Sequence, residues 1–149
     1  NKTPIVHNGR EDEIKIGKGI VLKDGNDVAI IACGVLVHEA MKAAEGLASQ
    51  GISAAVIDMH TLKPLDTDLV DEYISKCGSL VTAEDHSIIG GLGSAVAEYS
   101  SATKPVPIER IGVQDRFGES GEAQEMLDLL HLSSPHITEA AKRAVSRKA

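Results

Sequence analysis

The sequence is poor in aromatic residues: it lacks tryptophan and has one phenylalanine and two tyrosines among 149 residues. A platform that stacks single-stranded nucleic acid needs exposed aromatic side chains. The net charge is −7, and no Lys/Arg cluster is present that could neutralise a phosphate backbone. The four bases of the C-terminal KRAVSRKA are typical of the last turns of a helix. We therefore expect no nucleic-acid partner.

Cysteine and long apolar runs are scarce as well. Cys33 and Cys77 form no C-x-x-C pair and are too few for a metal cage, which predicts two reduced thiols, no metal site and a cytoplasmic protein. No apolar run reaches membrane-spanning length and no signal-peptide pattern is present, so we expect no membrane partner. Because the chain begins at Asn1 without a methionine, we expect it to be processed or part of a longer polypeptide.

What the sequence does contain is an alternation of apolar runs and amphipathic segments. Continuous apolar runs predict buried strands, and apolar residues at three- and four-residue spacing predict helices. The predicted strands are 20–22, 28–34, 52–59, 79–84 and 105–112, and the predicted helices are 37–50, 67–77, 90–102, 122–131 and 133–148. Ser134 is the expected N-cap of the last helix, with Pro135 at its first position.

This order predicts an α/β protein with a three-layer α/β/α sandwich. Short strand–helix–strand connections indicate right-handed crossovers and a mostly parallel five-stranded sheet. Asp24-Gly25 turns the first strand tightly into the second, which predicts one antiparallel edge strand. Residues 1–16 are polar and irregular and are interpreted as an arm or linker, with residues 17–149 as the single domain.

The stretch AEDHSIIGGLGSAVAE (83–98) contains a glycine-rich helix start directly after a predicted strand. Such a start at the carboxyl edge of a sheet can bind an anion. Against a dinucleotide, Val96 stands where the third glycine of G-x-G-x-x-G belongs, and no Gly-Lys-Ser/Thr sequence is present for a P-loop. Two interpretations remain: the glycines make a tight turn and allow close packing, or they form a small-anion or nucleotide-binding regulatory site.

Two groups of polar residues are further candidates for function. His60 and His86 follow predicted strands and, with Glu84 and Asp85, could form an acid–His cluster for a metal or a general base, or a hydrogen-bonded hinge that meets another subunit.

The second group lies in the loop DRFGESG (115–121), which contains the only phenylalanine of the chain. Asp115 and Arg116 are adjacent and need partners elsewhere. Phe117 is expected to be either a plug over the core or an anchor at an interface.

Taken in order, IIACG (30–34), IDMHTLKPLD (57–66), TAEDHSIIGGLGSAVAE (82–98) and IERIGVQDRFGESG (108–121) resemble the C-terminal domain of transketolase, from about Ile16 onward. The resemblance is closest to the separate C-terminal subunit of split archaeal and bacterial transketolases. The corresponding domain of 1-deoxyxylulose-5-phosphate synthase is similar, and the β subunits of 2-oxo acid dehydrogenases are similar more distantly.

The resemblance implies a thiamine-diphosphate enzyme, with Mg²⁺, that transfers a two-carbon ketol unit between sugar phosphates. In that family the cofactor and metal are held by two other domains, and this chain has no G-D-G…N metal motif. We therefore expect no catalytic, cofactor-binding or metal-binding residue here, and no activity of this chain alone. The implied partners are the diphosphate- and pyrimidine-binding domains, on the same chain or a separate subunit, and a homodimer mate.

The resemblance also assigns interface or architecture roles to particular positions. The residues carried over in this way are Glu84, His86, Gly90, Gly91, Gly93, Asp115, Arg116 and Phe117. The alternatives that stay open are the anion-binding regulatory module and the same domain of 1-deoxyxylulose-5-phosphate synthase.

Overall fold

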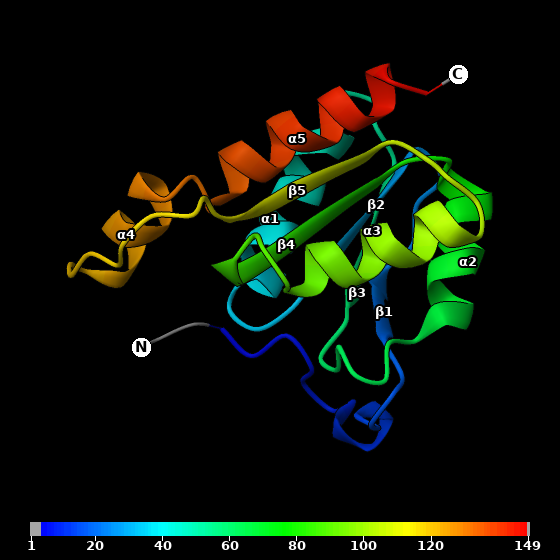
Figure 1. The fold of residues 1–149 in the computed structure, drawn as a ribbon, viewed down its shortest axis with the longest axis horizontal. Helices are drawn as coiled ribbons and strands as arrows, with labels where there is room; N and C mark the ends of the chain where they lie inside the picture. Colours follow the sequence, from blue (N-terminus) through cyan, green and yellow to red (C-terminus); the bar gives the residue numbers. More distant parts are fainter. Residues whose placement is uncertain (1–3, 149) are drawn as a thin grey trace.

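A computed structural model describes residues 4–148, which form one mixed sheet covered by helices on both faces (Figure 1). The strands are β1 (Ile20–Lys23), β2 (Val28–Ala32), β3 (Ala54–Asp58), β4 (Leu80–Ser87) and β5 (Ile108–Val113). The helices are α1 (Leu36–Ala48), α2 (Thr67–Cys77), α3 (Leu92–Ala102), α4 (Ala123–Leu129) and α5 (Ser134–Ser146), and a 3₁₀ turn, η1 (Glu11–Glu13), lies before β1.

The sheet has the strand order β1-β3-β2-β4-β5. Its β3, β2, β4 and β5 neighbours pair in parallel, and only β1 runs antiparallel to its neighbour β3. The predicted α/β/α sandwich with one antiparallel edge strand is therefore confirmed. The strand that follows β2 in the chain, β3, lies on one side of it, and β4 lies on the other, so the order of strand addition reverses at β2.

The central strand β2 supplies both halves of the core. All five of its residues are fully buried, and successive side chains of a strand point to opposite faces. Val28, Ile30 and Ala32 pack in the layer that contains α1 and α5. Ala29 and Ile31 pack in the layer that contains α2 and α3. This double burial explains why the sequence of the strand is continuously apolar.

The ends of α2 are set by neighbouring residues, whereas the start of α5 is bound by a side chain far away in the sequence. Asp66 caps α2 by accepting a hydrogen bond from the Leu69 N–H at 3.4 Å, and Gly78 ends the same helix in the left-handed conformation. The predicted N-cap of α5 is wrong by one residue: Ser133 is the cap and Ser134 is the first helical residue. The Ser134 N–H donates instead to the Glu39 carboxylate of α1, at 2.7 Å.

Candidate functional site

Glu84 lies near the carboxyl end of β4 and turns its side chain into the protein, where only 1% of it is exposed. Its two carboxylate oxygens accept hydrogen bonds from the first N–H groups of α3: Leu92 N–H at 2.7 Å and Gly93 N–H at 2.8 Å. A carboxylate in this place is favoured by the positive end of the helix dipole and by the charge-assisted hydrogen bonds. The N-terminus of α3 is thus already occupied by a negatively charged group of the same chain, the Glu84 carboxylate.

Two glycines of the motif make room for this carboxylate. A Cβ at Gly91 would overlap Oε2 of Glu84 and lie 2.7 Å from its Cδ. A Cβ at Gly93 would lie 2.8 Å from Oγ1 of Thr82 and 3.0 Å from Cδ of Arg110, so this glycine lets α3 approach the sheet. Gly90 adopts φ +77°, in the left-handed region that favours glycine, and makes the turn into the helix.

The expected acid–His cluster of Glu84, Asp85, His60 and His86 does not assemble. Strand β4 continues to Ser87, past its predicted end, so Glu84 and Asp85 point to opposite sides of the sheet. Asp85 and His86 are exposed, and Nδ1 of His86 lies 3.0 Å from the carbonyl oxygen of the next residue, Ser87. The structure separates these side chains: Glu84 binds the start of α3, Asp85 and His86 face solvent, and His60 is partly buried elsewhere.

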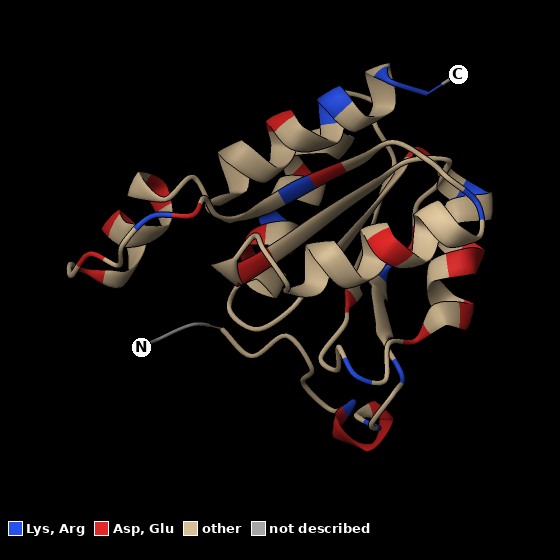
Figure 2. Cartoon of the chain, in the orientation of Figure 1, with Lys and Arg blue, Asp and Glu red and all other residues tan. Residues whose placement is uncertain are grey.

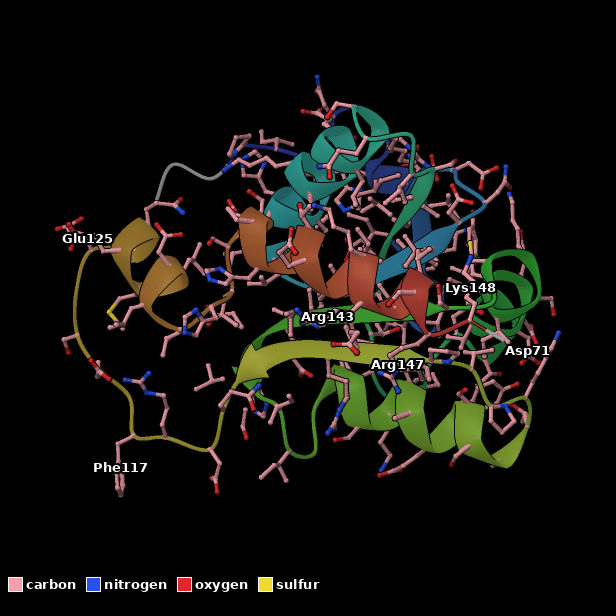
Figure 3. All side chains as sticks on the ribbon, turned by 90° about the horizontal axis from the view of Figure 1, so that it is seen from above. Asp71, Phe117, Glu125, Arg143, Arg147 and Lys148 are labelled. Atoms are coloured by element: carbon pink, nitrogen blue, oxygen red, sulfur yellow. The ribbon has the colours of Figure 1, made fainter. Side chains whose placement is uncertain are left out.

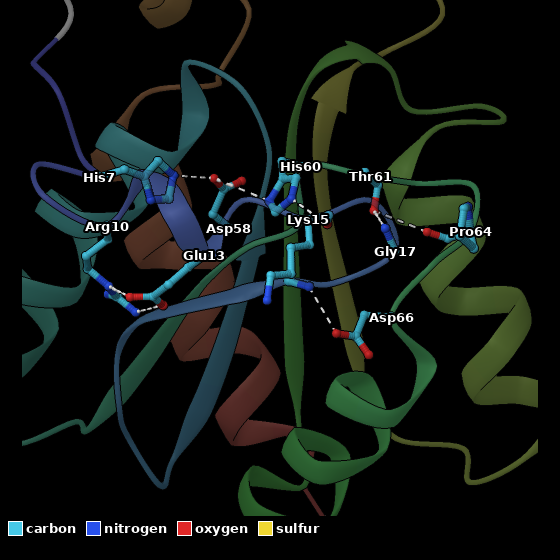
Figure 4. A network of polar contacts seen from close by, with 11 residues as sticks. His7, Arg10, Glu13, Lys15, Gly17, Asp58, His60, Thr61, Pro64 and Asp66 are labelled. Carbon is cyan, nitrogen blue, oxygen red and sulfur yellow. Dashed lines mark hydrogen bonds and ion pairs between the residues drawn. The ribbon is translucent and has the colours of Figure 1, made fainter.

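His60 belongs to a different cluster, which sequence reasoning missed (Figure 4). Nε2 of His7 lies 2.6 Å from Oδ2 of Asp58, the last residue of β3, and Nδ1 of His60 lies 4.0 Å from the same oxygen. The Asp58 side chain is 7% exposed. An aspartate at the end of an otherwise apolar strand was the signal available in the sequence, whereas nothing local links the arm residue His7 to it.

Phe117 is not a plug over the core, since it is 96% exposed. Figure 3 shows its ring pointing away from the protein, in the loop between β5 and α4. Arg116 in the same loop pairs with Glu119, and Asp115 is exposed. The structure therefore excludes one of the two sequence interpretations of Phe117.

The loop and α4 together make a projecting segment, residues 114–130, which stands off from the body of the domain (Figure 1). It contains no buried helix residue, and its charge is strongly acidic (Figure 2). Its charged residues are Asp115, Arg116, Glu119, Glu122, Glu125 and Asp128. A cavity of about 500 Å³ lies between α4 and α1, with Val35, Leu127 and Leu130 in its wall.

Both cysteines are free thiols, Cys33 half-buried after β2 and Cys77 buried at the end of α2. Burial raises the pKa of Cys33 to about 11, with smaller contributions from the charges of Glu84, Asp58 and Asp85. Burial also raises the pKa of Cys77 to about 11. A thiol that stays protonated is a poor nucleophile and a poor metal ligand at neutral pH, so neither cysteine is set up for chemistry.

Within residues 4–148, no group of three or more His, Cys, Asp or Glu side chains is arranged to hold a metal ion. Over the same residues, no helix is both long enough and apolar enough to cross a membrane.

Fold and site together define an α/β domain with a mostly parallel sheet, in which the Glu84 carboxylate binds the glycine-rich start of α3. Residues 17–137 match the family model described as the C-terminal domain of transketolase, and the chain belongs to this family. The transketolase assignment made from the motifs of the sequence is thereby confirmed.

Individual relatives agree with the family model. The 6-deoxy-6-sulfo-D-fructose transketolase subunit of Clostridium sp. (strain MSTE9) is 46% identical over 137 residues, which cover 92% of this chain and 42% of the relative. A 1-deoxy-D-xylulose-5-phosphate synthase of Halothermothrix orenii is 39% identical over 137 residues, 91% of this chain and 22% of that protein. The chain thus spans less than half the length of these relatives.

A solved structure gives the same result. A split-gene transketolase, described as an inactive beta4 tetramer, superposes with a TM-score of 0.88 at 44% identity, over 91% of this chain and 45% of that chain. The similarity extends over nearly all of the fold described above.

Proposed function

We propose that this chain is the C-terminal assembly domain of a thiamine-diphosphate-dependent transketolase, a cytoplasmic enzyme that transfers a two-carbon ketol unit between sugar phosphates. The cofactor and Mg²⁺ are then held by the rest of the enzyme, and this chain alone is inactive. Family membership and the partial coverage of its relatives support the proposal.

The glycine motif supports a structural role for Glu84, Gly91 and Gly93. An anion at the start of α3 would have to displace a buried carboxylate that already accepts two N–H groups at 2.7 and 2.8 Å. Displacing it would leave a charge in the interior without partners, which costs several kcal/mol. The motif is therefore better suited to holding α3 on the sheet than to binding a regulatory phosphate or nucleotide. His86 and Gly90, at the exposed end of the motif, are proposed to contact a neighbouring domain.

The observation that carries the assembly role is the exposure of Phe117. A large aromatic side chain that is 96% exposed on a projecting loop matches the aromatic anchors that dominate protein interfaces. Asp115 and Arg116 flank it, and the acidic residues around it favour a partner surface with a basic rim. We propose that this segment docks on the remaining domains of the enzyme or on the dimer mate.

The test is reconstitution with the remaining transketolase domains, produced as a separate polypeptide. Phe117→Ala is expected to weaken their association about tenfold to thirtyfold, as loss of an aromatic anchor does. Ile16→Ala is the matched control, since Ile16 is 84% exposed but lies in the N-terminal arm. Ketol transfer, assayed over a panel of sugar phosphates, should fall in parallel with association. If the wild type and Phe117→Ala bound the remaining domains equally well, the role of Phe117 as an interface anchor would be refuted.

A second candidate is favoured by the relatives. The synthase of Halothermothrix orenii is 39% identical over nearly the whole chain, so the same domain could serve a 1-deoxyxylulose-5-phosphate synthase. The reconstituted enzyme discriminates between them: it would condense pyruvate with a sugar phosphate if it were the synthase, and would need a ketose phosphate donor if it were a transketolase.

A further inference from the structure

The N-terminal arm is held against the end of β3 and the loop that follows it (Figure 4). His7 pairs with Asp58 at 2.6 Å, and Nε2 of His60 lies 3.1 Å from the carbonyl oxygen of Lys15. The Gly17 N–H donates to Oγ1 of Thr61 at 2.9 Å. Two of these three contacts pass through a histidine ring, so the docking of the arm depends on where the imidazole protons are.

The hydrogen-bond partners determine which ring nitrogens carry protons. A carbonyl oxygen only accepts, so Nε2 of His60 must donate to Lys15. An ionised carboxylate only accepts, so Nε2 of His7 must donate to Asp58. Each neutral ring then has its lone pair on Nδ1. Both Nδ1 atoms are buried and have no hydrogen-bond partner within the described residues, as is also true of Oδ1 of Asp58.

The two rings differ in what an added proton would meet. Nδ1 of His60 faces Oδ2 of Asp58 across 4.0 Å, an arrangement of two acceptors that gains nothing while the ring is neutral. A proton on that nitrogen would convert the contact between His60 and Asp58 into an ion pair, and His60 would then bridge Lys15 and Asp58. A proton on Nδ1 of His7 would meet no acceptor among the described residues, but the charge that it brings would turn the 2.6 Å contact of Nε2 with Asp58 into an ion pair, so both rings contribute.

Other charged groups near the cluster do not compete for Asp58. In the arm, Arg10 is engaged by Glu13 at 2.6 Å. Beyond the loop, Lys18 is paired with Asp66 at 3.4 Å. Among the other strand ends, Cys33 after β2 stays neutral because burial raises its pKa to about 11, and Glu84 and Asp85 of β4 add only negative charge.

We infer that His7, Asp58 and His60 form a proton-operated strap, in which uptake of a proton by either ring tightens the arm on the sheet. A protonated imidazole donates from both of its nitrogens and carries a positive charge, so the strap tightens on acidification. The inference concerns the arm of this chain and stands whether or not the proposed transketolase assembly is correct.

The experiment is hydrogen–deuterium exchange of the backbone amides of residues 11–18, at about pH 5.5 and about pH 8, corrected for the intrinsic exchange rate. Protection of the segment is expected to rise about fivefold at the lower pH, which corresponds to the free energy contributed by one partly exposed ion pair. In His60→Gln the side-chain amide can still donate to Lys15 but cannot be protonated, so the pH response should shrink. In the double variant His7→Gln/His60→Gln, in which neither side chain can be protonated, it should disappear. His86→Gln, which replaces an exposed histidine elsewhere, should respond as the wild type does.

A second measurement needs no variant. Nitrogen chemical shifts of the His60 ring should show a proton on Nε2 alone when the ring is neutral, and the arm should gain protection in step with the appearance of a second ring proton. Protection that is flat or falls on acidification would overturn the inference. So would a wild-type pH response in the double variant His7→Gln/His60→Gln, or a His60 ring protonated on Nδ1 alone at the higher pH.

Discussion

Replacing Gly91 by alanine tests whether the glycine motif exists to seat the Glu84 carboxylate. The new Cβ would overlap Oε2 of Glu84 and lie 2.7 Å from its Cδ, so the carboxylate must move away from Leu92 and Gly93. The two hydrogen bonds that it accepts there are charge-assisted, and each such bond contributes about 1.5–3 kcal/mol. Allowing for partial relaxation, we expect Gly91→Ala to destabilise the domain by about 4 kcal/mol.

Gly90→Ala is the matched control one residue earlier. A Cβ at Gly90 meets nothing within 4 Å, so the cost there is the left-handed backbone alone, about 1–2 kcal/mol. Urea unfolding followed by circular dichroism would measure both variants, and Gly91→Ala should also lower Tm by roughly 8–16 °C. A Gly91→Ala variant no less stable than Gly90→Ala would refute the account of the motif.

Three further predictions follow from the pKa values and the exposed surface. Cys33 and Cys77, with pKa values raised to about 11 by burial, should react with a thiol reagent at neutral pH about 100-fold more slowly in the native chain than in urea. Lys76 hydrogen-bonds the Asp24 carboxylate and is the largest cause that holds the pKa of Asp24 below its ordinary value. The stability due to Asp24 is therefore present above the ordinary pKa of about 4 and is lost as the pH falls through the lower folded pKa. Asp24→Asn should accordingly reduce stability at neutral pH and flatten the acid limb of the unfolding curve. Phe117→Ala should change the free energy of unfolding of this domain by less than about 0.5 kcal/mol, because its ring packs against nothing in the domain.

Elements whose signals are local could be predicted from the sequence. Helix α2 has the predicted bounds, because the Asp66 cap and the Gly78 stop lie next to it in the chain. The buried strands were found because double burial makes them continuously apolar, as in β2. Strand β1 was predicted from its apolar run and the Asp24-Gly25 turn as an antiparallel edge strand; it is one, but it pairs with β3 and not with β2, the strand into which the turn leads.

Contacts between distant residues could not be predicted in the same way. The first residue of α5 was misplaced because Glu39, which accepts its N–H, lies on another helix. The acid–His cluster was wrong because it depended on where β4 ends, and strand ends carry weak signals. The pairing of His7 with Asp58 spans 51 positions, and no periodicity connects an irregular arm to a strand end. The transketolase motifs identified the family without revealing these contacts.

The central claim is that this chain contributes assembly to an enzyme whose cofactor is bound elsewhere. Calorimetric titration of thiamine diphosphate with Mg²⁺ tests it most directly, first into this chain and then into the complete enzyme. The account predicts no binding to this chain and stoichiometric binding once the remaining domains are present. Stoichiometric binding to this chain alone would contradict it.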